Sequence, residues 1–320
     1  MKDFCVLGSG IAGSTIAEIL SKKYTVEVFD KARGPGGRTS NKRYKSNLSF
    51  DHGLQYFNPK TKEFKKLIHK LCKKKILKVW EGNHLDFSLK KSDNNPKYIG
   101  RKANNDICKY QLKNIKQNYL SCIKRINYKK KTWEVTLKNN FTYKFKGLII
   151  TCPYPQLKKL CRKFLKKNML NLNIRMQPNI TLMIAMKNNK NSRLSSIKFN
   201  DDILAWGSNE NSKNKFKSNI NLWTLQSSLA WAKKNIRKYR SDNKCIEKLL
   251  LRFLQIMGLK KENVIFQKAH GWLYSYSYTQ TKIKSYWDNK CRLGVCGDWL
   301  LGPKAEDAWI SASALSKRIK

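Results

Sequence analysis

The stretch DFCVLGSGIAGSTIAEILSKKYTVEVFD, residues 3–30, decides the fold of this chain. Residues 3–8 form a short apolar run that ends on glycine, and residues 11–22 have the apolar spacing of a helix. Residues 24–30 form a second apolar run with the length of a strand. A strand, a helix and a strand in such close succession predict a βαβ unit, whose strands are parallel and whose sheet is covered on both faces.

The loop between the first strand and the helix has the spacing G-x-G-x-x-G, with Gly8, Gly10 and Gly13 as its glycines. Gly8 allows the tight turn, Gly10 lets backbone approach a pyrophosphate, and Gly13 permits close packing of the helix on the strand. Asp30 ends the second strand, where an acid accepts hydrogen bonds from ribose hydroxyls. The pattern therefore predicts a dinucleotide site, with the phosphates at the helix N-terminus. In this segment we expect contacts from Gly8, Gly10, Ile11, Ala12, Gly13 and Asp30.

A second glycine cluster, KARGPGGRTS at residues 31–40, follows directly and favours FAD over NAD. Its glycines can bring backbone close to a second stretch of the dinucleotide, and Arg38 can make a forked contact to phosphate or flavin charge. The alternative interpretation is a basic turn without a ligand. The cofactor contacts expected here are Lys31, Arg33, Gly37 and Arg38.

The run from Gly8 to Arg38 resembles the flavin amine oxidase superfamily. The segment DHGLQYF, residues 51–57, resembles the D-x-G-x-Q-Y-F segment of the renalase-like branch, and GDWLLGPKAEDAW, residues 297–309, resembles its closing motif. The resemblance covers nearly the whole chain and is most specific at its two ends. It implies that residues 51–57 lie beside the isoalloxazine of FAD and that residues 297–309 hold its ribityl-phosphate part and the edge of the flavin. The cofactor contacts implied are Gly53, Gln55, Tyr56, Gly297, Asp298, Ala308 and Trp309.

The chain departs from the family pattern at four positions. The pattern often has glycine where this chain has Asp307 and Ala312, and arginine where it has Gly271 and Lys304. FAD binding tolerates these changes, whereas substrate identity does not follow from them. No cysteine or histidine stands in a motif that tethers flavin, so we expect non-covalent FAD.

Aromatic residues alternate in HGWLYSYSY, residues 270–278, and therefore lie on one face of a strand. One interpretation is an aromatic wall that stacks a flat substrate, and the other is the core face of an antiparallel sheet. With the resemblance, the first interpretation gives Gln55, Tyr56, Phe57, Trp272 and Tyr274 as candidates for the substrate pocket. The sequence identifies no catalytic residue.

These observations predict an α/β protein with a Rossmann-like FAD-binding domain and a second, mostly antiparallel-sheet substrate domain. The FAD-binding domain would comprise residues 1–57, 98–157 and 287–320. The substrate domain would comprise residues 58–97 and 158–286.

The function that we expect is that of an FAD-dependent oxidoreductase, since no catalytic triad, paired carboxylates or metal cluster stands out and a flavin performs the redox step itself. The resemblance implies that a small planar reductant, such as an isomeric dihydronicotinamide dinucleotide, gives a hydride to the flavin, with oxygen as the acceptor. An amine oxidase or a desaturase of the same superfamily is the alternative among enzymes. A desaturase would be expected to have an apolar patch that associates with a membrane, and the sequence does not indicate one.

The 320-residue chain has a formal charge of +46, from 67 Lys and Arg against 21 Asp and Glu. The lysines are spread along the chain, so we expect a solvated basic surface and no specific nucleic-acid partner. The competing hypothesis from another class is a non-enzymatic nucleic-acid or anion-binding protein. Nine cysteines without a CxxC pair argue against structural zinc and indicate free thiols. We expect a cytoplasmic protein, because the sequence offers neither a signal peptide nor an apolar run of roughly 20 residues.

Overall fold

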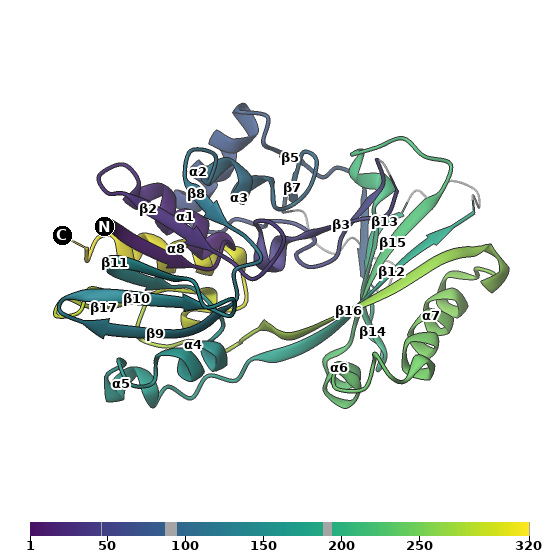
Figure 1. Ribbon diagram of the computed structural model, residues 1–320. Coiled ribbons are helices and arrows are strands. Elements are labelled where there is room, and N and C mark those ends of the chain that lie inside the picture. The colour runs from purple at the N-terminus through teal and green to yellow at the C-terminus, as the bar shows by residue number, and fades with distance from the viewer. Residues whose placement is uncertain (46, 87–94, 188–193, 320) are drawn as a thin grey trace.

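The computed structural model describes residues 1–45, 47–86, 95–187 and 194–319, which form two lobes (Figure 1). Each lobe is built on one large sheet. Both chain ends lie in the first lobe, and the long strand β16 (Val264–Tyr276) runs from near this lobe along the second (Figure 1). The first lobe is therefore assembled from segments that are far apart in the sequence.

The first sheet is Rossmann-like, with strands in the order β17-β18-β11-β1-β2-β8. Its strands are β1 Lys2–Leu7, β2 Val26–Phe29, β8 Lys116–Asn118, β9 Ile123–Lys129, β10 Thr132–Leu137, β11 Thr142–Ile150, β17 Tyr286–Asp288 and β18 Leu293–Val295. The pairs along this order are parallel except that β17 is antiparallel at its edge. β1 and β2 pair with Phe4 opposite Val26, which confirms the predicted βαβ start. β9 and β10 extend the sheet as an antiparallel hairpin on β11.

Helices cover both faces of this sheet, as parallel strands require. They are α1 Ile11–Leu20, α2 Lys62–Lys73, α3 Asp106–Gln111, α4 Tyr154–Cys161, α5 Lys167–Leu170 and α8 Ala305–Ser316. Alternate side chains of β1 point to opposite faces, so Phe4 and Val6 join a core with α1, α2, α3 and α8. Cys5 and Leu7 join a second core with α4 and the hairpin.

The second sheet has the order β16-β12-β15-β14-β13-β6 and is antiparallel except for the pair of β13 and β6. Besides β16, its elements are β6 Asn83–Asp86, β12 Gln177–Met186, β13 Leu194–Lys198, β14 Leu204–Asn209, β15 Asn221–Ser227, α6 Leu229–Asn235 and α7 Asn243–Met257. Ile180, Leu182 and Ile184 of β12 pack with residues of α7 in one core. Met183 and Ala185, on the other face, pack against Leu48 and Phe50 from the first part of the chain.

Two small antiparallel ribbons connect the lobes. They are β3 Asn41–Arg43 with β4 Ser49–Asp51, and β5 Leu77–Val79 with β7 Tyr98–Gly100. The remaining short helical turns are η1 Gly37–Thr39, η2 Asn211–Lys213, η3 Lys261–Asn263 and η4 Asp298–Leu300. The end of β4 leads directly into the segment 51–57, which thus lies where the lobes meet.

The structure divides two predicted segments differently from the expected domain boundaries. Residues 58–97 were expected in the substrate domain, yet Phe64, Ile68 and Leu71 of α2 are buried in a core of the first lobe. β6, from the same segment, pairs with the second sheet. Residues 158–174 likewise continue the core beneath the first sheet. An amphipathic pattern predicts that a helix has a buried face, but not which sheet covers it.

No helix in the described ranges is long and apolar enough to cross a membrane. All nine cysteines are unpaired. Within the described residues, no group of three or more His, Cys, Asp or Glu side chains is placed to hold a metal ion.

Candidate cofactor and substrate site

The two glycine-rich loops lie side by side at the carboxyl ends of β1 and β2. Gly10 and Gly36 form a parallel backbone bridge, and the N–H of Gly36 donates to the carbonyl of Ser9 at 2.9 Å. Gly8 and Gly36 have φ values of +107° and +127°, which side chains disfavour. A Cβ on Gly13 would lie 1.9 Å from the carbonyl oxygen of Gly8, so α1 packs this closely on β1 only with glycine there.

The N-terminus of α1 is open toward the space beside Gly10. A Cβ on Gly10 would meet the carbonyl oxygen of Gly36 first, at 3.7 Å. α1 begins without a side-chain cap and without an acidic residue in its first turn. The N–H groups of Ile11 and Ala12 are therefore available at the positive end of the helix dipole. This geometry fits a pyrophosphate group.

Asp30 lies beside this loop at the end of β2. Its Oδ2 accepts hydrogen bonds from the N and Oγ of Ser9 at 2.8 and 2.6 Å, and its Oδ1 accepts one from the N of Ala32 at 2.9 Å. A carboxylate has about four acceptor sites, so Asp30 is oriented by these bonds and keeps capacity for a ribose hydroxyl. Lys31 and Arg33 are exposed at the rim of this region.

Arg38 and Asp298 form a forked ion pair that joins the second glycine loop to the closing motif. Nη1 of Arg38 donates to Oδ2 of Asp298 at 2.7 Å, and Nη2 donates to Oδ1 at 2.6 Å. Nη1 also donates to the carbonyl of Ser275 at 3.0 Å. The forked contact expected for Arg38 is thus made to a protein carboxylate, while part of the guanidinium keeps free donor capacity.

The closing motif presents different residues on different sides. Gly297 precedes Asp298, and its N–H donates to Oγ of Ser311 at 3.0 Å, which fixes the strand end against α8. Ala308 is buried in the core with α1, and Trp309 packs against Phe64 of α2 with ring centroids 5.5 Å apart. Asp298 therefore faces Arg38, whereas Trp309 faces α2.

Asp307, one departure from the family pattern, caps the start of α8. Its Oδ2 accepts a hydrogen bond from the N of Lys304 at 2.8 Å. With Glu306 and Asp307 in its first turn, α8 presents carboxylates where α1 presents free N–H groups. The N-terminus of α1 is therefore the better anion site of the two.

The segment 51–57 begins with a very close approach at Gly53. A Cβ on Gly53 would lie 2.1 Å from the carbonyl oxygen of Arg38 and 3.3 Å from Cζ2 of Trp272. The N–H of Leu54 donates to the same Arg38 carbonyl at 2.8 Å. Gly53 therefore brings together the second glycine loop and β16.

The three residues after Leu54 have different surroundings. Gln55 is buried, and its Nε2 donates to the carbonyls of Asp51 and Gly53 at 2.6 and 3.1 Å. Tyr56 points toward the second lobe, where its ring lies near those of Trp80 and Trp206. Phe57 is fully buried in the core of the first lobe, on the opposite side of the chain from Tyr56. The structure therefore places Phe57 in the core and not at a pocket wall.

The aromatic face of β16 lies between the lobes. Nε1 of Trp272 donates to the carbonyl of His52 at 3.1 Å, and both Trp272 and Tyr274 are partly buried. Gly271 faces the other way, and a Cβ there would lie 2.4 Å from Cε1 of Tyr239. The position where the family pattern often has arginine is thus closed by Tyr239.

Two histidines that sequence reasoning missed complete this face. The ring of His52 lies 5.2 Å from that of Trp272 and 4.9 Å from that of His270, and His270 lies 4.3 Å from Trp272. His52 is 6% exposed, and among the described residues its Nδ1 has no hydrogen-bond partner. The signal that could have found His270 is its place two residues before Trp272, on the same face of the strand.

The pKa of His52 is lowered to about 4, chiefly by burial and also by the neighbouring His270 and Lys42, against the raising effect of Asp51. Burial also lowers the pKa of His270, with Arg240 and Lys42 acting in the same direction. Both imidazoles are therefore neutral at neutral pH, and each neutral ring carries one acceptor nitrogen.

The residues present fit FAD. The open N-terminus of α1 and the space beside Gly10 suit its pyrophosphate, and Asp30 suits its adenosine ribose. Arg38, Asp298 and Gly53 define the other end of the site, where the ring system would reach the aromatic face of β16.

Comparisons with known proteins agree with this geometry. Residues 6–71 match the family model of the NAD(P)-binding Rossmann-like domain. Mouse renalase is 27% identical over 171 residues, and this match spans about half of each protein, 50% of this chain and 49% of renalase. An Exiguobacterium protein described as a candidate protoporphyrinogen oxidase superposes with a TM-score of 0.76 at 8% identity, over 99% of this chain and 98% of that one. A triple mutant of putrescine oxidase superposes with a TM-score of 0.73 at 10% identity, over 99% and 98% of the two chains.

The fold and the site define a flavoprotein of the two-domain type, with a Rossmann-like domain and a mostly antiparallel second sheet, and the cofactor that they support is FAD. Within that class, the chain is similar in sequence to renalase over about half of its length, and its fold is similar to those of the two oxidases.

Proposed function

We propose that the protein is an FAD-dependent oxidoreductase that oxidises a small planar reductant, with an isomeric dihydronicotinamide dinucleotide as substrate and oxygen as the final acceptor. The observation that carries this proposal is the meeting of three segments at Gly53. There the second glycine loop, the turn 51–55 and the aromatic face of β16 touch one another. When bound, FAD supplies the ring that accepts the hydride.

The residues of the chain position and enclose the substrate. Trp272 and Tyr274 offer flat faces on which a planar ring can stack, and such orientation supplies much of the rate in a hydride transfer. No acid or base is needed for a dihydronicotinamide, because the donor leaves as an aromatic cation. The excess of lysine raises the local concentration of a phosphate-bearing substrate.

Rapid mixing of the oxidised protein with isomeric dihydronicotinamide dinucleotides, reduced at ring positions other than the usual one, tests this proposal. We expect the flavin band to bleach within seconds and air to restore it with formation of hydrogen peroxide. A flavin that stays oxidised with these isomers but bleaches with a primary or secondary amine would contradict it.

An amine oxidase is the second candidate, and the environment of His52 favours it. A neutral, buried imidazole whose Nδ1 lacks a partner can accept a hydrogen bond from the N–H of an uncharged amine. If the protein is an amine oxidase of this kind, its amine substrate would reduce the enzyme faster as the pH rises, because more of the amine is then uncharged. His52→Leu would then weaken amine binding by about two- to tenfold, the cost of one hydrogen bond, and leave dihydronicotinamide oxidation unchanged.

We further propose a cytoplasmic location, which the nine unpaired cysteines support, since such compartments keep thiols reduced. Thiol titration of the denatured protein, purified without a reductant, should find all nine cysteines reactive. A lower count that a reductant restores would contradict this location.

A further inference from the structure

Four charged side chains are buried together where the lobes meet. They are Asp51 from β4 and Glu210, Lys213 and Lys215 from the segment around η2, and we call them the interlobe cluster. The exposed fraction of each side chain is between 0% and 2%. Desolvation of a charge is costly, so such a group persists only where each member is paired and hydrogen-bonded.

Lys213 bonds two members of the cluster and Gln55, one bond for each of its three ammonium hydrogens. Its Nζ donates to Oε1 of Glu210 at 2.9 Å, to Oδ2 of Asp51 at 3.3 Å and to Oε1 of Gln55 at 3.3 Å. It also lies over the indole of Trp80, 5.2 Å from the ring centroid. Lys213 therefore connects its own lobe to the turn of the other lobe through two separate residues.

Lys215 is equally buried but has a simpler role. Its Nζ pairs with Oδ2 of Asp51. Burial lowers the pKa of Lys215, and Asp51 opposes that shift. Burial alone would raise the pKa of Asp51, but Lys215 and Lys213 outweigh it and hold that pKa below its usual range. The two lysines thus share Asp51, whereas Lys213 also contacts Glu210, Trp80 and Gln55, and of these three only Gln55 belongs to the turn 51–55.

The bond to Gln55 extends through the turn to the ion pair of the candidate site. With its Oε1 held by Lys213, the Gln55 amide points its Nε2 at the carbonyls of Asp51 and Gly53. The following N–H, that of Leu54, is bonded to the carbonyl of Arg38. The Arg38 guanidinium in turn holds Asp298.

We propose that Lys213 is a positioning residue of the cofactor site: it orients the Gln55 amide and thereby holds the turn 51–54 against Arg38. The proposal rests on the proposed function only in taking FAD as the ligand of that site. Lys213, a side chain of the second lobe, would thus help to shape the cofactor site on the first lobe.

The first experiment needs no cofactor. Hydrogen exchange is measured on the apoprotein of wild type, Lys213→Met and Lys215→Met, with attention to the N–H of Leu54. Both variants remove one buried ammonium from Asp51, so both lose thermal stability. We expect exchange at Leu54 to rise at least tenfold more in Lys213→Met than in Lys215→Met, since Lys213 alone of the two holds Gln55. Equal exchange in the two variants would overturn the proposal.

The second experiment is a double-mutant cycle on FAD affinity. We expect Lys213→Met and Gln55→Met each to weaken FAD binding about tenfold, and the double variant to be no weaker than Gln55→Met alone. Lys215→Met should stay within threefold of wild type. Additive losses in the cycle, or equal losses for the two lysine variants, would overturn the positioning role.

A third variant covers the case in which Lys213→Met does not fold. Glu210→Gln with Lys213→Met removes one charge of each sign and keeps the buried charges balanced. We expect this variant to fold, to exchange rapidly at Leu54 and to bind FAD weakly. Wild-type exchange at Leu54 in this variant would overturn the proposal. A wild-type protein that binds no FAD would instead contradict the proposed function, while the apoprotein exchange would still decide the role of Lys213.

Discussion

The glycine-rich edge, residues 8–38, and the interlobe turn, residues 51–55, form two ends of one site by different physical means. At the edge, the shape comes from backbone: Gly8, Gly13 and Gly36 stand where a Cβ would clash or where φ is positive. At the turn, the shape comes from side chains of distant segments, with Lys213 and Trp272 fixing the backbone from the second lobe. The edge therefore depends on the absence of side chains, and the turn on charge and burial.

This difference means that the two ends should respond to different perturbations. Filling space at the glycine-rich edge should remove the cofactor and leave the fold intact. Changing a charge at the turn, or changing the pH, should affect the stability of the protein more than its affinity for FAD. The following predictions test that contrast, from the largest expected effect to the smallest.

Gly10→Val should abolish FAD binding. The added side chain would fill the space beside the α1 N-terminus, where the backbone otherwise meets the pyrophosphate. Isothermal titration with FAD measures the loss, and far-ultraviolet circular dichroism checks that the fold remains. Gly34→Ala is the matched control, because a Cβ at Gly34 meets no atom of the described residues within 4 Å. FAD binding by Gly10→Val at wild-type affinity would place the pyrophosphate elsewhere.

Arg38→Met should lower the free energy of unfolding by about 1–3 kcal/mol, because it leaves the carboxylate of Asp298 buried without its partner. We place the loss below that of a fully buried pair because the Arg38 side chain is 31% exposed. Urea unfolding of the apoprotein measures it. Adding Asp298→Asn should recover most of the stability but not FAD affinity. An Arg38→Met protein as stable as wild type would show that the pair contributes nothing to the fold.

Acidification should destabilise the protein through His52. Its pKa is about 4 in the folded protein against an ordinary value of 6.5, so between these pH values the unfolded chain binds a proton that the folded chain does not. The free energy of unfolding should therefore fall as pH falls from about 6.5 to about 4. His52→Leu should remove roughly 1–3 kcal/mol of that loss.

Urea unfolding at several pH values measures this effect, with His69→Asn as a control at an exposed position on α2. Identical pH dependence in wild type and His52→Leu would show that His52 is not the group responsible.

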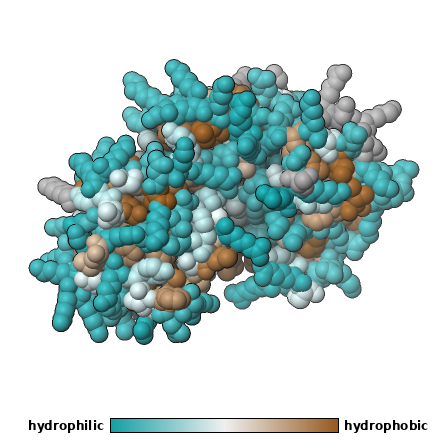
Figure 2. Space-filling view, turned by 45° about the horizontal axis from the view of Figure 1, so that its top comes forward, coloured by the Kyte–Doolittle hydropathy of each residue, from teal (hydrophilic) through white to brown (hydrophobic). Residues whose placement is uncertain are grey.

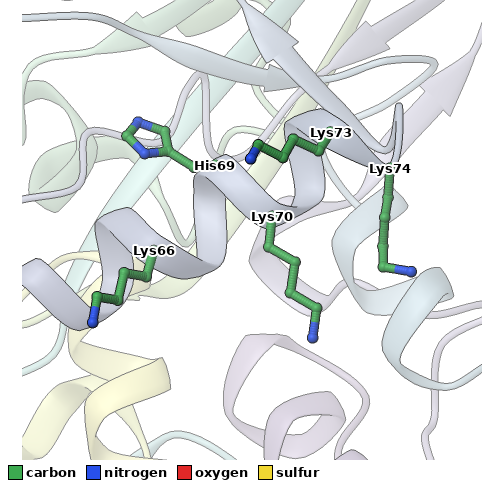
Figure 3. Close-up of a pocket in the computed structure, with 5 residues that line it drawn as sticks. All are labelled: Lys66, His69, Lys70, Lys73 and Lys74. Atoms are coloured by element: carbon green, nitrogen blue, oxygen red, sulfur yellow. The ribbon is translucent and has the colours of Figure 1, made fainter.

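Substitutions on the lysine-rich face of α2 should have the smallest effect of all, both on DNA affinity and on stability. Lys66, His69, Lys70, Lys73 and Lys74 line an open hollow of about 480 Å³, and Lys66, Lys70 and Lys74 extend to the same side of the helix (Figure 3). Hydrophilic residues cover most of the face seen in Figure 2. We expect glutamine at those three positions to leave affinity for duplex DNA unchanged at physiological salt and to stabilise α2 by a few tenths of a kcal/mol, because like charges at i and i+4 repel.

Electrophoretic mobility shift and thermal unfolding measure the two effects. The matched control is glutamine at Lys129, the last residue of β9, and at Lys130 and Lys131 in the turn that leads to β10. Tight, salt-sensitive DNA binding that only the α2 variant weakens would reverse our interpretation of the charge.

The glycine-rich edge could be predicted from the sequence and the interlobe turn could not. Spacing from Gly8 to Asp30 encodes the βαβ unit because all its parts are local, and the structure confirms the parallel pairing. Asp51 and Lys213 stand far apart in the sequence, and no periodic pattern links them. A buried lysine in a chain with 67 Lys and Arg also carries no signal of its own. The packing of α2 on the first lobe could not be predicted either, because the apolar positions of this helix could pack on either sheet.

The most direct test of the central claim is the visible absorption spectrum of the purified protein before and after acid precipitation. The account predicts the two-band spectrum of oxidised flavin, with FAD released into a yellow supernatant when the protein is precipitated. Colour that stays with the pellet would contradict non-covalent binding. A colourless protein whose spectrum and stability do not respond to added FAD would contradict the claim that this is a flavoprotein.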